Sequence, residues 1–351
     1  MKIKEVLSQA KTIWEAIFGD SKEFIDKYFE YVGEDNIVYL EDGKRIHGFC
    51  LVPTYNFSLF NSLIKADYIS GLCVADDERR KGNGKKIVKS VLRHSFDMGH
   101  QVVFLIAQDN ELMQFYQQFG FGNSCINSRR VFKLKEINEV FLETHSLNFD
   151  YKTFLKNYDC GDIMSRKFIL HDRKTLDFYH ESGYVFANII DDEDEGFSPG
   201  AIFVDEDEFV NVVELNVKNR IQKAILLSLI SDRYEKDVHY KEPFREYNSE
   251  GIYMDIFSKS KRDIYQMMRV VDVDACLKIF AANHPFIDVI LNIDDDCIAE
   301  NNKVVWIKNG ELIVFENVED VPGQRELKDI TIKRLTTMCF ANTYLTLLFD
   351  E

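Results

Sequence analysis

The sequence has no long hydrophobic run. Its longest candidate, "AILLSLI" at residues 224–230, is far shorter than the roughly 18 apolar residues that a membrane helix needs. The opening "MKIKEVLSQAKTIW" also lacks the apolar core of a secretory signal peptide. We therefore expect a cytoplasmic protein with no membrane partner.

Cysteine is present without the spacing of a metal or redox motif. The seven cysteines are an odd number and include no Cys-x-x-Cys pair. Free thiols in a reducing compartment explain this usage better than a disulfide framework does. We expect no metal site.

Positive charge is scarce as well. The 351 residues include 59 acidic and 43 basic ones, which gives a formal net charge of −16. Nucleic-acid binding needs a basic surface, so we expect no nucleic-acid partner. The acidity suits a cationic partner such as a polyamine, an aminoglycoside or a lysine side chain. The plainer explanation, that acidity only keeps the protein in solution, stays open.

The stretch "DDERRKGNGKK" at residues 76–86 is a local exception to this acidity. A dinucleotide fingerprint would need a third glycine where Ile87 stands, and a P-loop would need an earlier glycine before Gly84. The stretch is therefore another kind of phosphate loop or an ordinary turn. Its glycines and nearest basic residues are Gly82, Gly84, Arg79, Arg80, Lys81 and Lys85.

The flanking segments predict that this loop joins a strand to a helix. Upstream, "ADYISGLCV" at residues 66–74 is short and rich in β-branched and aromatic residues. Downstream, apolar residues recur at helical spacing from Ile87 to Phe96, and Gly99 is placed to end the helix. The first N–H groups of a helix favour an anion, so glycines there would let a pyrophosphate approach. The alternative is a solvated helix start.

The next segments complete a recognisable order. "QVVFLIA" at residues 101–107 predicts a strand, and "QDNELMQFYQQFGF" predicts a short helix that ends in Phe-Gly-Phe. This order resembles that of the acyl-CoA-dependent N-acetyltransferase (GNAT) superfamily. In that order a strand, an Arg-x-x-Gly-x-Gly loop, a helix and a second strand are followed by Asn, Tyr and Gly-Phe. The matching residues are Arg79, Gly82, Gly84, Asn110, Tyr116, Gly120 and Phe121.

This resemblance implies that the loop binds the pyrophosphate of acetyl-CoA, the co-substrate. The residues implied for this binding are Leu72, Cys73, Val74, Arg79, Arg80, Lys81, Gly82, Asn83, Gly84, Lys85 and Asn110.

Acetyl transfer needs a polarised thioester carbonyl and a proton for the departing thiolate. A backbone N–H in the strand Leu72-Cys73-Val74 could polarise the carbonyl. Tyr116, a phenol with an ordinary pKa of about 10, could supply the proton. A tyrosine that only packs the helix on the sheet is the alternative. Cys73 itself is more simply a buried apolar residue.

The residues before this region predict two helices and a hairpin. "TIWEAIFGDSKEFIDKYFEYV" at residues 12–32 predicts two short helices, the second capped by Ser21. "NIVYLEDGKRIHGFCLVP" predicts a hairpin that turns at Asp42-Gly43. A group of aromatic residues could line an acceptor pocket, although we favour an ordinary core role. This group is Phe18, Phe24, Tyr28, Phe29 and Tyr31.

Beyond residue 130 the sequence predicts a second domain of similar design. "FVNVVELNV" at residues 209–217 and "KNRIQKAILLSLISDRYEKDVHY" after it indicate strand, helix and strand, without a glycine loop. The preceding "DDEDEG" at residues 191–196 is most simply a solvated loop. This part fits an acyltransferase-like domain that lacks a cofactor site.

The C-terminal part predicts a third domain. "FIDVILNID" at residues 286–294 alternates apolar residues, and "VVWIKNGELIVF" at residues 304–315 predicts a hairpin turning at Asn309-Gly310. Before them, "MMRVVDVDACLKIF" at residues 267–280 leads into a helix. Its Met-x-Arg-Val-Val-Asp-Val run resembles the start of the sterol-carrier-like domain in the enhanced intracellular survival (Eis) acetyltransferases.

We therefore predict an α/β (α+β) fold with tandem acyl-CoA N-acyltransferase-like mixed sheets, flanking helices and a C-terminal sterol-carrier-like α+β domain. The expected domains are residues 1–130, which bind acetyl-CoA, a degenerate copy at residues 131–262, and the sterol-carrier-like domain at residues 263–351.

The expected function is direct transfer of an acetyl group from acetyl-CoA to a primary amine of a small-molecule or peptide acceptor. In the Eis-like family the general base is linked to the terminal carboxylate, here that of Glu351, although the ending "NTYLTLLFDE" lacks the family's aromatic end. A homo-oligomer is left open. The alternative is a catalytically silent acyl-CoA sensor or a protein that binds an apolar ligand.

Overall fold

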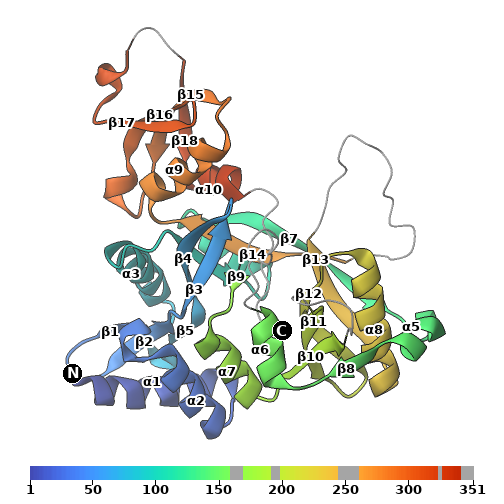
Figure 1. Cartoon of the computed structure of the whole chain (residues 1–351). Helices are drawn as coiled ribbons and strands as arrows, with labels where there is room; N and C mark the ends of the chain where they lie inside the picture. Colours follow the sequence, from blue (N-terminus) through green and yellow to red (C-terminus); the bar gives the residue numbers. More distant parts are fainter. Residues whose placement is uncertain (159–168, 191–197, 244–260, 323–325, 341–351) are drawn as a thin grey trace. The chain divides into compact units, whose positions relative to one another are not determined.

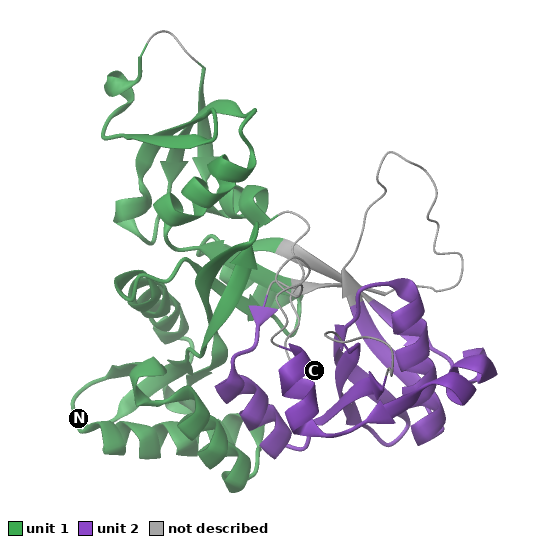
Figure 2. Ribbon diagram, in the orientation of Figure 1, with its two compact units in different colours: residues 1–125, 265–341 green, residues 126–264, 342–351 purple. Residues whose placement is uncertain are grey.

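The computed structural model describes residues 1–158, 169–190, 198–243, 261–322 and 326–340, without the side chains of 124–128, 242–243 and 261–265 (Figure 1). The chain divides into two compact units (Figure 2). Unit 1 contains residues 1–125 and 265–341, and unit 2 contains residues 126–264 and 342–351. The predicted division into three domains stays a prediction.

Unit 1 begins with two amphipathic helices, α1 (Ile3–Phe18) and α2 (Lys22–Val32). Ser21 caps α2 as predicted, because its hydroxyl accepts a hydrogen bond of 3.2 Å from the Phe24 N–H. α1 begins earlier than predicted, since its buried stripe already starts at Val6.

A three-stranded sheet follows, in the order β1-β2-β5. β1 (Ile37–Glu41) and β2 (Ile46–Leu51) form the predicted antiparallel hairpin, and β5 (Ser70–Val74) is the other edge strand. The turn contains Gly43, whose φ of +86° lies in the left-handed region. Asp42 accepts hydrogen bonds from the backbone there, so the predicted turn chemistry is confirmed.

A second sheet of unit 1 has the order β14-β6-β4-β3. Its strands are β3 (Thr54–Leu59), β4 (Ser62–Tyr68), β6 (Val102–Ile106) and β14 (Lys261–Val270). β4 and β6 are parallel, so the chain must cross over between them, and α3 (Asn83–Asp97) makes this crossover.

The predicted strand at residues 66–74 is in fact two strands. β4 pairs with β6 as far as Tyr68 opposite Phe104, and the Ile69 N–H then donates to the Phe104 carbonyl at 2.9 Å. Beyond Ile69 the chain pairs with β2 instead. Gly71 lies in this stretch with a φ of +65°, and the Trp14 ring occupies the place that a Cβ would take. β5 therefore parts from β6.

The helices after these strands follow the sequence prediction. α3 buries Ile87, Val88, Val91 and Leu92 and ends just before Gly99, whose φ is +71°. α4 (Asn110–Gln117) is capped by Asp109, whose carboxylate accepts the Leu112 N–H at 2.8 Å. β7 (Gly122–Phe132) follows.

The C-terminal part of unit 1 forms a four-stranded sheet in the order β17-β16-β15-β18. Helices α9 and α10 lie along one face of it (Figure 1). Asn309 and Gly310 have φ values of +50° and +81°, which confirms the predicted hairpin turn. The elements are α9 (Val273–Asn283), β15 (Asp288–Asp294), β16 (Lys303–Lys308), β17 (Glu311–Phe315), β18 (Leu327–Thr331) and α10 (Ile332–Phe340).

Unit 2 has a mixed sheet in the order β8-β10-β11-β12-β13-β7. Its strands are β8 (Ser146–Asn148), β10 (Val185–Ile190), β11 (Gly200–Asp205), β12 (Phe209–Asn216) and β13 (Asp237–Pro243), with the short β9 (Ile169–Leu170) besides. Its helices are α5 (Glu139–Thr144), α6 (Tyr151–Tyr158), α7 (Arg173–Glu181) and α8 (Arg220–Tyr234).

The predicted strand, helix and strand of unit 2 are confirmed as β12, α8 and β13. β12 and β13 are parallel, with Phe209 opposite Asp237. This is the topology of β4, α3 and β6 in unit 1, so the two units contain the same crossover. The predicted acidic loop at residues 191–196 lies outside the described residues.

The place where β5 separates from β6 depends on Gly71, and we predict how a substitution there changes the free energy of unfolding. Gly71→Ala should destabilise unit 1 by about 1–2 kcal/mol for the left-handed backbone and by about 1–3 kcal/mol more for the overlap with Trp14. Gly19→Ala is the matched control, because Gly19 has a φ of +74° but open space around its Cβ position. Chemical denaturation should separate the two variants by the second amount. Equal losses would show that Trp14 does not hold this strand.

Candidate active site

The basic loop leads into a helix N-terminus without a side-chain cap. Gly82 is the N-cap residue of α3, in the left-handed conformation, and its lack of a side chain leaves the first N–H groups of α3 uncapped. A Cβ on Gly82 would meet nothing within 4 Å, and one on Gly84 would only touch Phe115 and Leu72, at 3.6 and 4.0 Å. This helix start is therefore open and positively polarised.

The predicted basic side chains surround this helix start and are exposed. Arg79 contacts Asp76 at 3.1 Å and donates to the Val74 carbonyl at 3.3 Å. Lys85 donates to the Gln118 amide oxygen at 2.9 Å. Both contacts are at the surface, where water and a ligand compete for them at little cost.

The buried carboxylate of Glu78 connects residues of the loop by hydrogen bonds. Its residue is 8% exposed, and its oxygens accept hydrogen bonds from Arg45 at 2.7 Å, Lys81 at 3.1 Å and Asn83 at 3.1 Å. The Lys81 ammonium lowers the pKa of Glu78 below its ordinary value. Glu78 is not among the residues that the sequence predicts for the site, because an acid is not expected inside an anion-binding loop.

The contact with Glu78 also changes the interpretation of Asn83. Its side chain, predicted to bind the cofactor, is buried and turned toward Glu78, whose carbonyl it also contacts at 3.2 Å. Only the backbone of Asn83 is therefore suited to face a ligand.

β5 supplies the predicted strand next to this helix start. It is an edge strand, and beyond Ile69 none of the described residues continues its pairing on the side away from β2. Leu72 and Val74 are half-buried, while Cys73 is fully buried. Burial raises the pKa of the Cys73 thiol to about 12. The strand therefore offers backbone groups, but no thiolate.

Tyr116 projects from α4 into the core cluster against which Leu72 and Val74 pack. It is 6% exposed, and the rings of Phe115 and Phe121 lie edge-on to it at 5.1 and 5.7 Å. Burial raises its pKa well above the ordinary value. Within the described part of the chain, no residue forms a hydrogen bond with its hydroxyl. Tyr116 is therefore a protonated phenol with an available O–H.

The remaining predicted site residues do not belong to the group around the start of α3 and β5. Asn110 lies exposed in the first turn of α4. The cap of this helix is Asp109, which was not predicted from the sequence. Tyr28, Phe29 and Tyr31 are buried, as the favoured core interpretation expects. Phe18 is 42% exposed. Glu351 lies outside the described residues.

The corresponding helix start in unit 2 is that of α8, and it has a side-chain cap. Asn219 caps α8, since its side-chain oxygen accepts the Gln222 N–H at 2.9 Å, and Gln222 in turn accepts the Lys218 N–H at 2.8 Å. Asn219 thereby occupies the Gln222 N–H of α8, whereas Gly82, the N-cap of α3, has no side chain that could accept an N–H.

Within the described ranges, no group of three or more histidine, cysteine, aspartate or glutamate side chains could hold a metal ion. No helix in those ranges has the length and apolar character required to cross a membrane.

Known proteins match this architecture. Residues 3–124 match the family described as acetyltransferase (GNAT) domain. No curated protein matches the chain in sequence. A probable N-acyltransferase from Enterococcus faecalis V583 is 15% identical with a TM-score of 0.75, over 95% of this chain and 87% of that one.

Two further solved structures have similar folds. A GCN5-related N-acetyltransferase from Anabaena variabilis is 13% identical, with a TM-score of 0.75 over 95% of this chain and 87% of its own. Eis1 from Mycobacterium abscessus is 12% identical, with a TM-score of 0.67 over 97% of this chain and 88% of its own. The sterol-carrier-like nature of residues 263–351 stays a prediction. Residues 3–124 therefore form an acetyltransferase domain of the GNAT type, and the fold of the chain is similar to the folds of these three solved structures, Eis1 among them.

Proposed function

We propose that the protein is an N-acetyltransferase that moves an acetyl group from acetyl-CoA to a primary amine of a cationic acceptor. The contrast between α3 and α8 carries this proposal. Both are 15-residue helices that connect parallel strands. Only α3 begins with a bare backbone, at Gly82, and only α3 has a basic loop before it.

The groups around this helix start fit the parts of acetyl-CoA. The first N–H groups of α3 would donate to the pyrophosphate, helped by exposed cations such as Arg80. A backbone N–H on the open edge of β5 would donate to the thioester oxygen and stabilise the negative charge that develops there.

The transfer step needs a proton donor, and Tyr116 suits that role. The amine nitrogen attacks the carbonyl carbon, the C–S bond breaks with its electron pair going to sulfur, and Tyr116 donates its proton to the thiolate. The nitrogen loses a proton to a base or to water, and the Tyr116 phenolate regains a proton from water. The terminal carboxylate of Glu351 as that base stays a prediction.

The state of Cys73 supports direct transfer rather than an acyl-enzyme. A cysteine attacks as a thiolate, and a pKa of about 12 keeps Cys73 a neutral thiol near neutral pH. The negative charge of the chain supports a cationic acceptor, because it attracts cations from solution.

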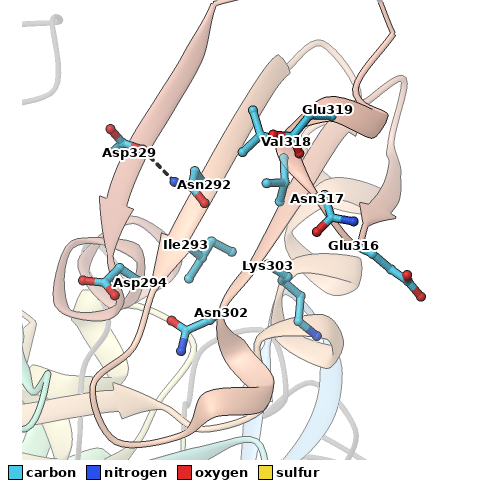
Figure 3. A pocket seen from close by; sticks show the side chains of 11 residues that line it. Asn292, Ile293, Asp294, Asn302, Lys303, Glu316, Asn317, Val318, Glu319 and Asp329 are labelled. Carbon is cyan, nitrogen blue, oxygen red and sulfur yellow. Dashed lines mark hydrogen bonds between the residues drawn. The ribbon is translucent and has the colours of Figure 1, made fainter.

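One cavity bears on the alternative of an apolar ligand. It lies on the C-terminal sheet of unit 1 and has a volume of about 590 Å³ (Figure 3). Acids and amides make up most of its lining, and Asn292 donates to Asp329 within it at 2.8 Å. Such a lining suits water or polar groups better than a sterol or an acyl chain.

A panel of amines tests the proposal as a whole. Thiol release from acetyl-CoA should be measured with polyamines, aminoglycosides and lysine peptides. We expect at least one of them to be acetylated. Tight binding of acetyl-CoA without thiol release on any acceptor would indicate a sensor.

The proposed binding of the pyrophosphate by the first N–H groups of α3 can be tested at Gly84. Gly84→Val should weaken coenzyme A binding by roughly 10- to 100-fold, the worth of one or two hydrogen bonds to a charged group, because the side chain would block the approach to the backbone. The fold should tolerate it, since a Cβ there makes only ordinary contacts. Gly82→Val adds backbone strain at a φ of +81° and is the less clean variant.

Calorimetry measures this affinity, and α8 supplies the matched control. Ile221 is the second residue of α8, as Gly84 is of α3, so a β-branched residue is acceptable at this helical position. Ile221→Gly should leave coenzyme A affinity unchanged. If Gly84→Val binds coenzyme A with native affinity, the start of α3 is not the pyrophosphate site.

Tyr116→Phe should lower kcat by ~10²–10⁴-fold, the usual contribution of general acid catalysis. KM for acetyl-CoA should stay the same, because only the hydroxyl is lost. Steady-state kinetics with an accepted amine measures both constants. Tyr179→Phe, which removes another buried phenol in unit 2, is the control. A near-native kcat for Tyr116→Phe would leave Tyr116 a packing residue.

A further inference from the structure

The Met-x-Arg-Val-Val-Asp-Val run of the sequence contains a completely buried arginine. Arg269, on β14, forms an ion pair with Asp295 in which Nη2 and Oδ1 are 2.6 Å apart, and both side chains are fully buried. A buried charge pair is rarely retained for stability alone, because desolvation offsets much of the attraction between the two charges. The other contacts of Arg269 indicate what it does.

Arg269 also holds the end of the helix that carries Tyr116. Its Nε donates to the Phe119 carbonyl at 2.6 Å, across 150 residues of sequence. The Phe119 N–H donates to the Tyr116 carbonyl at 3.0 Å, and the Phe119 ring packs on Phe115 at 5.3 Å. Phe119 thus connects the guanidinium to the turn that follows Tyr116.

Gly120 shows how closely this turn is packed. Its φ is +84°, and the Ile332 side chain of α10 occupies the place that a Cβ would take. The Nε of Arg269 lies 3.3 Å from the same place. The C-terminal part of unit 1 therefore contacts this turn through both β14 and α10.

Asp295 is itself fixed by its own loop. Its Oδ1 accepts the N–H groups of Cys297 at 2.9 Å and Ile298 at 3.2 Å, and its Oδ2 accepts the Asn301 amide at 2.8 Å. A carboxylate with this many donors has one position, so the guanidinium that it binds has one position as well.

We propose that Arg269, fixed by Asp295, is a positioning residue for Tyr116, and that the C-terminal part of unit 1 thereby sets the place of the proton donor. This rests on the proposed role of Tyr116. α4 has only eight residues, too few to be stable alone. The Tyr116 hydroxyl has no hydrogen-bond partner within the described residues, so its place depends on how the end of α4 is held.

Arg269→Lys tests this role, since lysine keeps the charge beside Asp295 but cannot donate in a fork to Asp295 and Phe119 together. We expect kcat to fall by about 10- to 100-fold, as for a catalytic group displaced by about an ångström, with KM for acetyl-CoA unchanged. In a Tyr116→Phe background, Arg269→Lys should cause no further loss of kcat. A purely structural role would lower the melting temperature without this dependence on Tyr116.

Two more variants complete the experiment. Lys303→Met breaks the 2.9 Å ion pair with Asp274 in the same part of unit 1, without a contact to Phe119, and should keep the native kcat. Asp295→Asn should act in the same direction as Arg269→Lys, and it serves if the lysine variant does not fold.

The outcomes separate this inference from the proposed function. A native kcat for Tyr116→Phe alone would overturn the role of Tyr116. If Tyr116→Phe loses turnover, a native kcat in Arg269→Lys, or an equal loss in both backgrounds, overturns the positioning role alone.

Discussion

The candidate site depends on one constraint, the parting of two strands after Phe104. A continuous strand from Ser62 to Val74 would pair with β6 throughout and leave no backbone group free between them. Instead the chain transfers its pairing from β6 to β2 at Ile69. Gly71 takes a left-handed conformation against Trp14 at this place. The unpaired edge of β5 follows from this parting, and Leu72 and Val74 of β5 pack against the core cluster that contains Tyr116.

Unit 2 shows that the topology alone does not make such a site. β12 pairs with β13 only as far as Val212 opposite Tyr240, so the corresponding strands part there as well. Beyond that point, however, β12 carries Glu214, whose buried carboxylate lies 3.1 Å from His171. The helix start is closed by Asn219. Unit 2 thus has the same crossover and the same parting of strands as unit 1, but its helix start carries a side-chain cap and its parted strand carries a buried carboxylate.

The features that the sequence predicts are those decided by neighbouring residues. The Ser21 cap and the Asn309-Gly310 turn depend on a few adjacent positions, and the loop with Tyr116 belongs to one short motif. Glu78 could not be predicted as a loop organiser, because its partner Arg45 lies 33 residues away. The contact of Arg269 with Phe119 spans 150 residues. Both involve buried charges, whose partners only the folded chain identifies.

Under the proposed function, an anionic co-substrate has to bind to an acidic protein. The net charge of −16 repels coenzyme A at a distance, but charges beyond about 8–10 Å are largely screened at physiological salt. Binding is therefore decided locally. There, Glu78 already neutralises part of Arg45 and Lys81, so the loop is less positive than its sequence suggests. The α3 N–H groups, which need no counter-charge, would then be the main hydrogen-bond donors to the anion.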